Sequence, residues 1–201
     1  MLKATAQGAR TTKDRIVEAA LETIKDEGFA GASARTIARR GGFNQALIFY
    51  HFGSVNDVLL AALDRTSEDR MAKYRDAVRN VDSIDEAIRV STELYREDLA
   101  SGHITVLSEM IAGSLDRPDL GPAIVERLEP WIVLTEEAVR NVLDRTGLGD
   151  LVPPRTIAYA IVALYLGVDL LSHLEHDDSR AEALFDAAAK LGGLLTPLLP
   201  K

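Results

Sequence analysis

A group of histidines and aspartates near the C-terminal end of this 201-residue sequence has the side-chain types that bind metal ions. His173 and His176 are three positions apart, which would place both imidazoles on one side of a helix, and Asp177 and Asp178 follow directly. The alternative is that these residues mark the end of a helix, where polar side chains and cationic histidines are favourable. We favour the helix end, and therefore predict no metal site and no cofactor.

A second candidate for chemistry is the segment Gly147-Leu148-Gly149, which resembles part of a nucleotide-binding loop. This segment follows a predicted helix, lacks a third glycine and has no strand beside it, whereas a dinucleotide-binding loop connects a strand to a helix. The sequence contains no Walker motif and no nucleophile elbow, and it has no cysteine to act as a nucleophile or a thiolate ligand. We therefore predict no catalytic residues and a protein that is not an enzyme.

The composition favours a soluble protein of one or two compact units, because 47% of the residues are hydrophobic. Residues 1–10 are small and polar, unlike a signal peptide. Each apolar run is soon interrupted by a charged residue, which predicts no membrane span and no membrane partner. The absence of cysteine suits a reducing cytosol, so we expect a cytoplasmic protein.

The net charge of −8 is distributed unevenly along the chain. Residues 1–53 contain eight basic and five acidic residues, hence a charge of +3, whereas the remainder contains fifteen basic and twenty-six acidic residues, hence −11. A polyanion would be attracted to the N-terminal part and repelled by the rest, although an excess this small can also arise by chance.

The elements that must position any functional side chains are helices nearly throughout. The first begins at Thr11, because Asp14 lies at the spacing of a capping box. We expect this helix to end at Gly28, since glycine tolerates a positive φ. Its apolar stripe at i, i+3, i+4 and i+7 consists of Val17, Ala20, Leu21 and Ile24.

Two short helices are predicted next. Ser33 caps the first of them, which stops at Gly41 and Gly42, where two glycines permit a tight turn. Asn44 opens the second, over residues 45–52. Three short helices before a long one are typical of a small DNA-binding head.

A fourth helix begins at Ser54, which repeats the capping-box spacing with Asp57. Further helices are predicted at 83–101, 104–115, 122–146, 155–176 and 180–196, separated by proline and glycine. The predicted fold class is all-α.

Residues 33–63 resemble the signature of the TetR (tetracycline repressor) family. The matching elements are Ile37-Ala38, Gly42, Phe49-Tyr50-His51-Phe52, Gly53-Ser54 and Val58-Leu59-Leu60. The resemblance implies a helix-turn-helix DNA-binding domain over residues 1–53 and a helical effector-binding and dimerisation domain over 54–201. It further implies a ligand-responsive repressor that binds a palindromic operator as a homodimer.

The resemblance also implies DNA contacts residue by residue. Base edges would face Gln45, Ala46 and Leu47, phosphates would face Phe49, Tyr50 and His51, and Arg35 occupies a DNA-facing position in the preceding helix. We add Asn44 to this set, although a capping role is the alternative for it. The chain departs from the family pattern at Leu47, Phe49 and Val55, where polar residues are common, so we expect fewer phosphate contacts than usual.

The chemistry of these side chains suits such contacts. The amide of Gln45 can pair bidentately with adenine, while Ala46 and Leu47 can pack on a thymine methyl group. Arg35 suits either guanine or phosphate. Arg39 and Arg40 would supply longer-range attraction to the DNA backbone.

Two C-terminal stripes with alternating spacings of 4 and 3 predict helices that pack lengthwise against other helices. By resemblance we assign them to a dimer interface, although both could be buried within one subunit. They comprise Ile157, Ile161, Leu164, Val168 and Leu171, and Leu184, Ala188, Leu191, Leu195 and Leu198.

The helices between head and interface would enclose a small, mainly apolar effector, by analogy with the family. The large residues assigned to this pocket are Leu107, Met110, Trp131, Tyr159 and Tyr165, and plain core packing is the alternative for each. An alternative for the whole chain is a helical interaction protein with a degenerate DNA-binding head.

Overall fold

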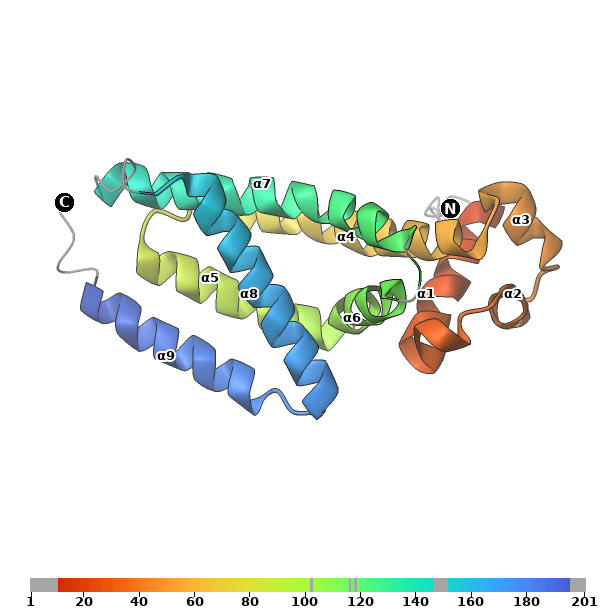
Figure 1. The fold of residues 1–201 in the computed structure, drawn as a ribbon. Coiled ribbons are helices and arrows are strands. Elements are labelled where there is room, and N and C mark those ends of the chain that lie inside the picture. The colour runs from red at the N-terminus through yellow and green to blue at the C-terminus, as the bar shows by residue number, and fades with distance from the viewer. Residues whose placement is uncertain (1–10, 102, 116, 118, 147–151, 196–201) are drawn as a thin grey trace, which may run out of the picture. The chain divides into compact units, whose positions relative to one another are not determined.

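The computed structural model describes residues 11–101, 103–115, 117, 119–146 and 152–195, and within these ranges the chain is helical apart from short turns (Figure 1). The helices are α1 (Thr12–Gly31), α2 (Ala34–Gly41), α3 (Ala46–Phe52), α4 (Val55–Arg79), α5 (Ile84–Ser101), α6 (His103–Ser114), α7 (Leu120–Thr146), α8 (Pro154–Glu175) and α9 (Ser179–Leu195). The prediction of an all-α fold is confirmed, and the predicted C-terminal helices agree with α5–α9 to within a few residues.

The chain divides into two compact units, of which the first ends at Arg65 and the second begins at Thr66. This division lies inside α4, later than the predicted boundary at residue 53. Val58, Leu59 and Ala62 are fully buried, so the first turns of α4 belong to the core of the first unit.

The first unit begins with the capping box predicted at Thr11. The Thr11 hydroxyl accepts a hydrogen bond from the Asp14 backbone N at 3.1 Å, and the Asp14 carboxylate accepts one from the Thr11 backbone N at 3.1 Å. Hydrogen bonds from Thr11 and Arg65 lower the pKa of Asp14 to about 2. The predicted end at Gly28 is instead a kink with φ of 69°, after which the helix resumes and ends at Gly31.

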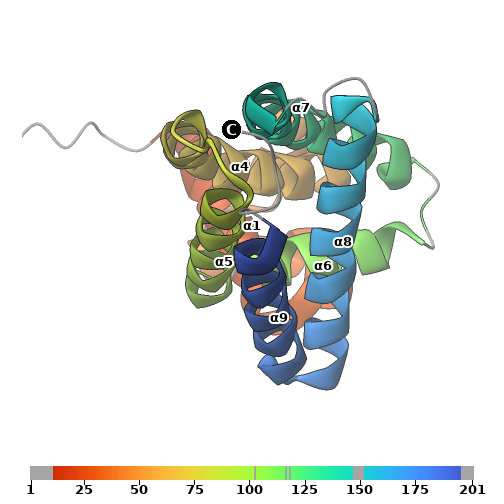
Figure 2. The same cartoon turned by 90° about the vertical axis from the view of Figure 1, so that its left-hand side faces the viewer.

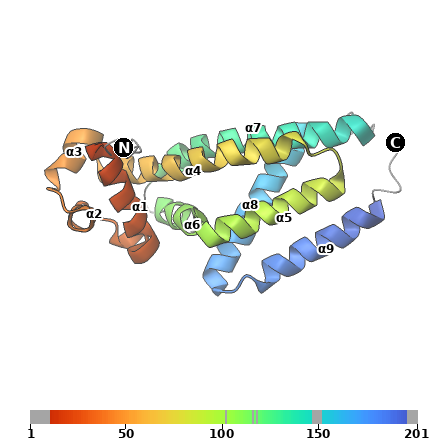
Figure 3. The same cartoon turned by 180° about the vertical axis from the view of Figure 1, so that it is seen from behind.

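The second unit consists of α5–α9 and the part of α4 from Thr66 onward. Within it α7 packs against α8 and α5 packs against α9, while α6 contacts α5, α7 and α8 (Figures 2 and 3). One buried cluster joins Val81, Val90 and Val142, and a second joins Tyr95 to Ala181. These clusters hold α4, α5, α7 and α9 around a shared interior.

Candidate functional site

The turn between α2 and α3 follows from its glycines. The Ser33 hydroxyl accepts from the Thr36 backbone N and caps α2, as predicted. Gly42 ends α2 with φ of 65°, a left-handed conformation that costs glycine no Cβ clash. Phe43 then packs against Gly41, whose missing side chain leaves room for the ring.

Asn44 is placed by a local hydrogen bond at the start of α3. Its Oδ1 accepts from the Ala46 backbone N at 2.9 Å, and its carbonyl oxygen accepts from the Leu47 backbone N at 2.9 Å. The side chain therefore bonds to the backbone at the start of α3, whose N-cap residue is Gln45, and it remains exposed to solvent. Asn44 stays a candidate for DNA contact as well as for a local structural role.

Helix α3 has one buried anchor and a broad exposed surface. Ile48 is fully buried, whereas Phe49 is 51% exposed and Tyr50 81% exposed. Gln45 and Ala46 are also exposed, while Leu47 and His51 are half-buried. An 81% exposed tyrosine on a helix anchored by isoleucine leaves apolar surface in water, which is typical of a contact surface.

Arg39 and Arg40 pair with acidic residues near the end of α1. Arg39 lies 3.5 Å from Glu27, while Arg40 lies 2.5 Å from Asp26 and 3.2 Å from Glu27. These pairs partly neutralise the attraction to phosphate predicted for the two arginines, because their charges are balanced within the unit.

Arg35 differs from both arginines. It is exposed, and it forms no ion pair with any residue of the described ranges. Its guanidinium is therefore available to an external anion.

The start of α4 is capped by Ser54. The Ser54 hydroxyl donates to Asp57 Oδ2 at 2.6 Å and accepts from the Asp57 backbone N at 3.1 Å. The residue that follows, Val55, is half-buried. The predicted Ser54–Asp57 capping pair is thus confirmed, and Asp57 places a negative charge in the first helical turn.

The side chains assigned to an effector pocket do not all come together. Leu107 is 7% exposed and Met110 fully buried, and the half-buried Trp131 ring lies 5.4 Å from the ring of Tyr74. Tyr159 is instead 64% exposed on the outside of α8, so it does not line the interior of this unit. The amino-acid type alone cannot distinguish an exposed from a buried tyrosine on the same helix.

The interior of the second unit also contains an ion pair that the sequence did not suggest. Asp98 of α5 pairs with Arg70 of α4 and accepts a hydrogen bond from the Tyr165 hydroxyl at 2.5 Å. Burial and the adjacent Asp98 charge raise the pKa of Tyr165, and burial likewise raises that of Tyr74. Arg70 and Tyr165 lie 28 and 67 positions from Asp98 in the sequence. Over such separations, the spacing of residues does not predict which side chains meet.

Asp169 of α8 is a second buried carboxylate, at 1% exposed. Its Oδ2 accepts from the Ser108 hydroxyl at 2.8 Å, whereas its buried Oδ1 has no hydrogen-bond partner among the described residues. Burial raises the pKa of Asp169 to about 7, and the negative charges of Asp98 and Asp178 act in the same direction.

The predicted interface stripes lie largely on the surface of α8 and α9. Exposed fractions are 41% for Ile161, 58% for Leu164, 59% for Leu171, 39% for Leu184 and 59% for Leu191. Ile157, Val168 and Ala188 are half-buried at the edges of these faces. The side chain of Leu195, and all of Leu198, lie outside the described residues.

Helix α8 is long and apolar enough to cross a membrane by length and composition alone, and α3 and α4 together pass the same test as a bent pair. The sequence analysis did not expect a stretch of this length and composition, because Arg155 and Glu175 stand at the two ends of α8 and do not interrupt it. A core helix of a soluble protein passes this test as well, and Asp169 is buried on α8 among protein groups.

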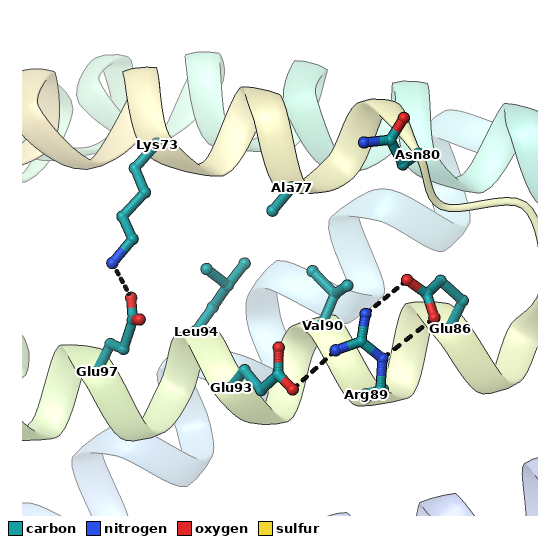
Figure 4. A pocket seen from close by; sticks show the side chains of 9 residues that line it. All are labelled: Lys73, Ala77, Asn80, Glu86, Arg89, Val90, Glu93, Leu94 and Glu97. Atoms are coloured by element: carbon teal, nitrogen blue, oxygen red, sulfur yellow. Dashed lines mark hydrogen bonds and ion pairs between the residues drawn. The ribbon is translucent and has the colours of Figure 1, made fainter.

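A shallow groove of about 270 Å³ lies between α4 and α5 (Figure 4). Its rim carries the ion pairs Lys73–Glu97 at 2.5 Å and Arg89–Glu86 at 2.6 Å, and Ala77, Val90 and Leu94 form part of its lining. These residues do not overlap the predicted effector pocket. The charged groups on this rim are paired with one another.

The two histidines that the sequence analysis weighed as metal ligands make other contacts. His173 Nε2 lies 3.4 Å from Glu109 Oε1, and His176 adopts a left-handed conformation at the C-cap of α8. Within the described ranges, no three His, Cys, Asp or Glu side chains are grouped as metal ligands. Residues 147–151, which contain the pair of glycines, are outside those ranges.

Comparison with known proteins places the helix-turn-helix in a family. Residues 16–62 match the family model for bacterial regulatory proteins of the tetR family. The HTH-type transcriptional regulator UidR of Escherichia coli (strain K12) is 24% identical over 191 residues, covering 94% of this chain and 95% of UidR.

Two solved structures share the fold over most of their length. The transcriptional regulator FadR of Bacillus subtilis in complex with stearoyl-CoA has a TM-score of 0.73 at 16% identity, over 88% of this chain and 95% of FadR. The multidrug binding protein EbrR complexed with imidazole has a TM-score of 0.64 at 25% identity, over 90% of this chain and 96% of EbrR.

Proposed function

Because this chain belongs to the TetR family of DNA-binding transcriptional regulators, which are not enzymes, we propose that it is a ligand-responsive repressor that binds a palindromic operator as a homodimer. The observation that carries the proposal is the exposed surface of α3, with Tyr50 at 81% exposed and Ile48 fully buried beneath it. A repressor of this kind acts in the cytoplasm, where the chromosome lies.

The proposed contact with DNA places α3 in the major groove. An α-helix fits that groove, and each base pair presents its own donor and acceptor pattern there. Gln45 reads a base edge, Ala46 and Leu47 supply apolar contacts, and Tyr50 and His51 donate to phosphate oxygens. Arg35, whose charge is not balanced by an ion pair within the described ranges, adds a contact to phosphate or guanine.

The proposed dimer forms through α8 and α9. Leu164, Leu171 and Leu191 are each more than half exposed, and such an apolar surface is stabilised by burial against a second copy. The same burial accounts for the apolar composition of α8. Two heads are needed to reach successive major grooves, which lie roughly 34–36 Å apart.

The proposed effector is a small molecule bound inside the second unit. Support comes from two sources: the mainly apolar interior around Leu107, Met110 and Tyr165, and the ligands named with FadR and EbrR. Helix α4 begins in the first unit and continues into the second, so ligand occupancy would reach α3 through it. The effector must favour a conformation whose heads bind the operator poorly.

The test is selection of genomic DNA fragments bound by the purified full-length chain, combined with sedimentation of the protein alone and with DNA. We expect one enriched motif, made of two inverted half-sites about one helical turn apart, and a dimer at micromolar concentration. No enrichment at low ionic strength, or a monomer on a single half-site, would contradict the proposal.

The second candidate function is that of a helical interaction protein whose DNA-binding head no longer binds DNA. The ion pairs of Arg39 and Arg40 with Asp26 and Glu27 favour it, as do the apolar residues Leu47 and Phe49. It predicts a well-folded dimer that enriches no fragment in the same selection.

A further inference from the structure

The carboxylate of Asp169 is a buried group of the second unit to which the proposed function assigns no role. It is 1% exposed and lies in the C-terminal half of α8, and its Oδ2 accepts a hydrogen bond from the Ser108 hydroxyl at 2.8 Å. Its Oδ1 has no partner among the described residues. A buried carboxylate that lacks a full set of partners is destabilising, so its presence in a core calls for a reason.

Asp98 is a buried carboxylate whose negative charge, in contrast, is paired with a cation. Asp98, at 3% exposed, has the Arg70 guanidinium on one oxygen and the Tyr165 hydroxyl on the other. Arg70 is thereby committed to Asp98. Among Asp98, Arg70 and Asp169, one negative charge has no cationic partner when Asp169 is ionised.

None of the described groups that interact electrostatically with Asp169 carries a positive charge. Ser108 of α6 is a neutral donor, and the carboxylates of Asp98 on α5 and Asp178 before α9 repel the charge. Burial is the main cause that raises the pKa of Tyr95 on α5 and of Tyr165 on the same helix as Asp169, and the negative charge of Asp169 adds to both shifts. No cation within the described ranges pairs with Asp169.

The surroundings of Asp169 are aromatic as well as anionic. The Tyr95 and Tyr165 rings meet edge to face at 5.5 Å, and the Phe185 ring lies 5.0 Å from Tyr95. The Tyr95 hydroxyl is engaged with the Ser172 hydroxyl at 3.3 Å, one helical turn from Asp169. Aromatic faces and a carboxylate together attract organic cations, the former through the ring quadrupole and the latter through charge.

We propose that Asp169 anchors the effector, and that the effector is an organic amine whose protonated nitrogen donates to Asp169 Oδ1 while its apolar body packs among Tyr95, Tyr165 and Phe185. This rests on the proposed function, since it names the chemical class of the effector of that domain. Binding satisfies the orphaned oxygen, neutralises the excess charge and excludes anionic ligands, which Asp98 and Asp169 repel.

The experiment uses the full-length chain and named probes: n-octylamine, 2-phenylethylamine and tryptamine, each paired with the alcohol of the same carbon skeleton. Binding is measured by calorimetry and by the shift of the unfolding midpoint at about pH 8, where Asp169 and the amines are both charged. The variants are Asp169→Asn, which keeps the shape and removes the charge, and Asp186→Asn, an exposed aspartate of α9, as the matched control.

We expect at least one amine to bind the wild type and the control about tenfold more tightly than its alcohol, and Asp169→Asn to lose that preference. Affinity for the amine should also fall on lowering the pH to about 5.5, because a neutral carboxyl no longer pairs with the cation. The inference is overturned if no amine binds, or if the preference survives in Asp169→Asn. Binding of the selected operator by the same preparations separates the outcomes, since DNA binding without amine binding removes this inference and leaves the proposed regulator intact.

Discussion

A Cβ atom on Gly41 would lie 2.1 Å from Cε1 of Phe43, so the Phe43 ring packs directly on the Gly41 backbone where α2 turns toward α3. Gly41→Ala should therefore destabilise the first unit by about 1–3 kcal/mol, the usual cost of forcing a methyl group into a packed core. Chemical denaturation followed by circular dichroism measures the change.

The matched control for Gly41→Ala is Gly121→Ala in α7, because a Cβ there meets no atom within 4 Å. That variant should leave stability unchanged or raise it slightly, since alanine favours a helix. Equal stability of the two variants would mean that Phe43 has room to move.

Gln45→Ala and Tyr50→Phe should affect DNA binding in different ways. The first removes a base contact, so it should relax the preference at one base pair of each half-site, at a cost of about 1–3 kcal/mol. The second removes a phosphate contact, so it should weaken all sequences alike. Selection from a randomised operator measures both, and an unaltered sequence profile for Gln45→Ala would rule out base readout by this residue.

The dimer proposal predicts that charges on the exposed face of α8 separate the subunits. Leu164 and Leu171 are 58% and 59% exposed, and the double variant Leu164→Glu/Leu171→Glu should sediment as a folded monomer with weaker operator binding. Leu115→Glu is the control, because Leu115 is 84% exposed but lies outside α8 and α9. A dimer that persists in the double variant would move the interface elsewhere.

The pKa of Asp169 predicts how stability depends on pH. Burial raises this pKa in the folded state from 3.8 to about 7, so the folded protein binds more protons than the unfolded chain between these values. Stability should therefore fall as the pH rises from about 4 to about 7, and Asp169→Asn should remove this part of the dependence.

Unfolding midpoints of wild type and Asp169→Asn across that pH range provide the test, with Asp186→Asn as the control. The variant should be the more stable protein above about pH 7, because it carries no unpaired buried charge. Parallel pH profiles for the wild type and Asp169→Asn would show that the pKa of Asp169 is the same in the folded and the unfolded chain.

Local signals in the sequence predicted most of the helices. The capping pairs Thr11–Asp14 and Ser54–Asp57 and the left-handed Gly42 are fixed by interactions within a few residues, so the amino-acid types suffice to place them. The positive φ predicted for Gly28 is confirmed, but the helix end predicted there is wrong, because the chain returns to helix after the kink.

Long-range partners were not predictable in this way. The Arg40–Asp26 and Arg70–Asp98 pairs depend on which helices pack together, and so does the burial of Asp169. Tyr159 and Tyr165 are identical in type on the same helix, yet one is exposed and the other bonds to Asp98. Only the packing of α8 against its neighbours separates them.

The most direct test of the account compares binding to the selected operator, at low ionic strength, between the wild type and the variant Gln45→Ala/Tyr50→Ala. Both side chains are exposed, so the unfolding midpoint should not change. We predict that the variant binds DNA at least about tenfold more weakly, since it lacks a base contact and a phosphate contact. Equal binding by both proteins would contradict the placement of α3 in the DNA groove.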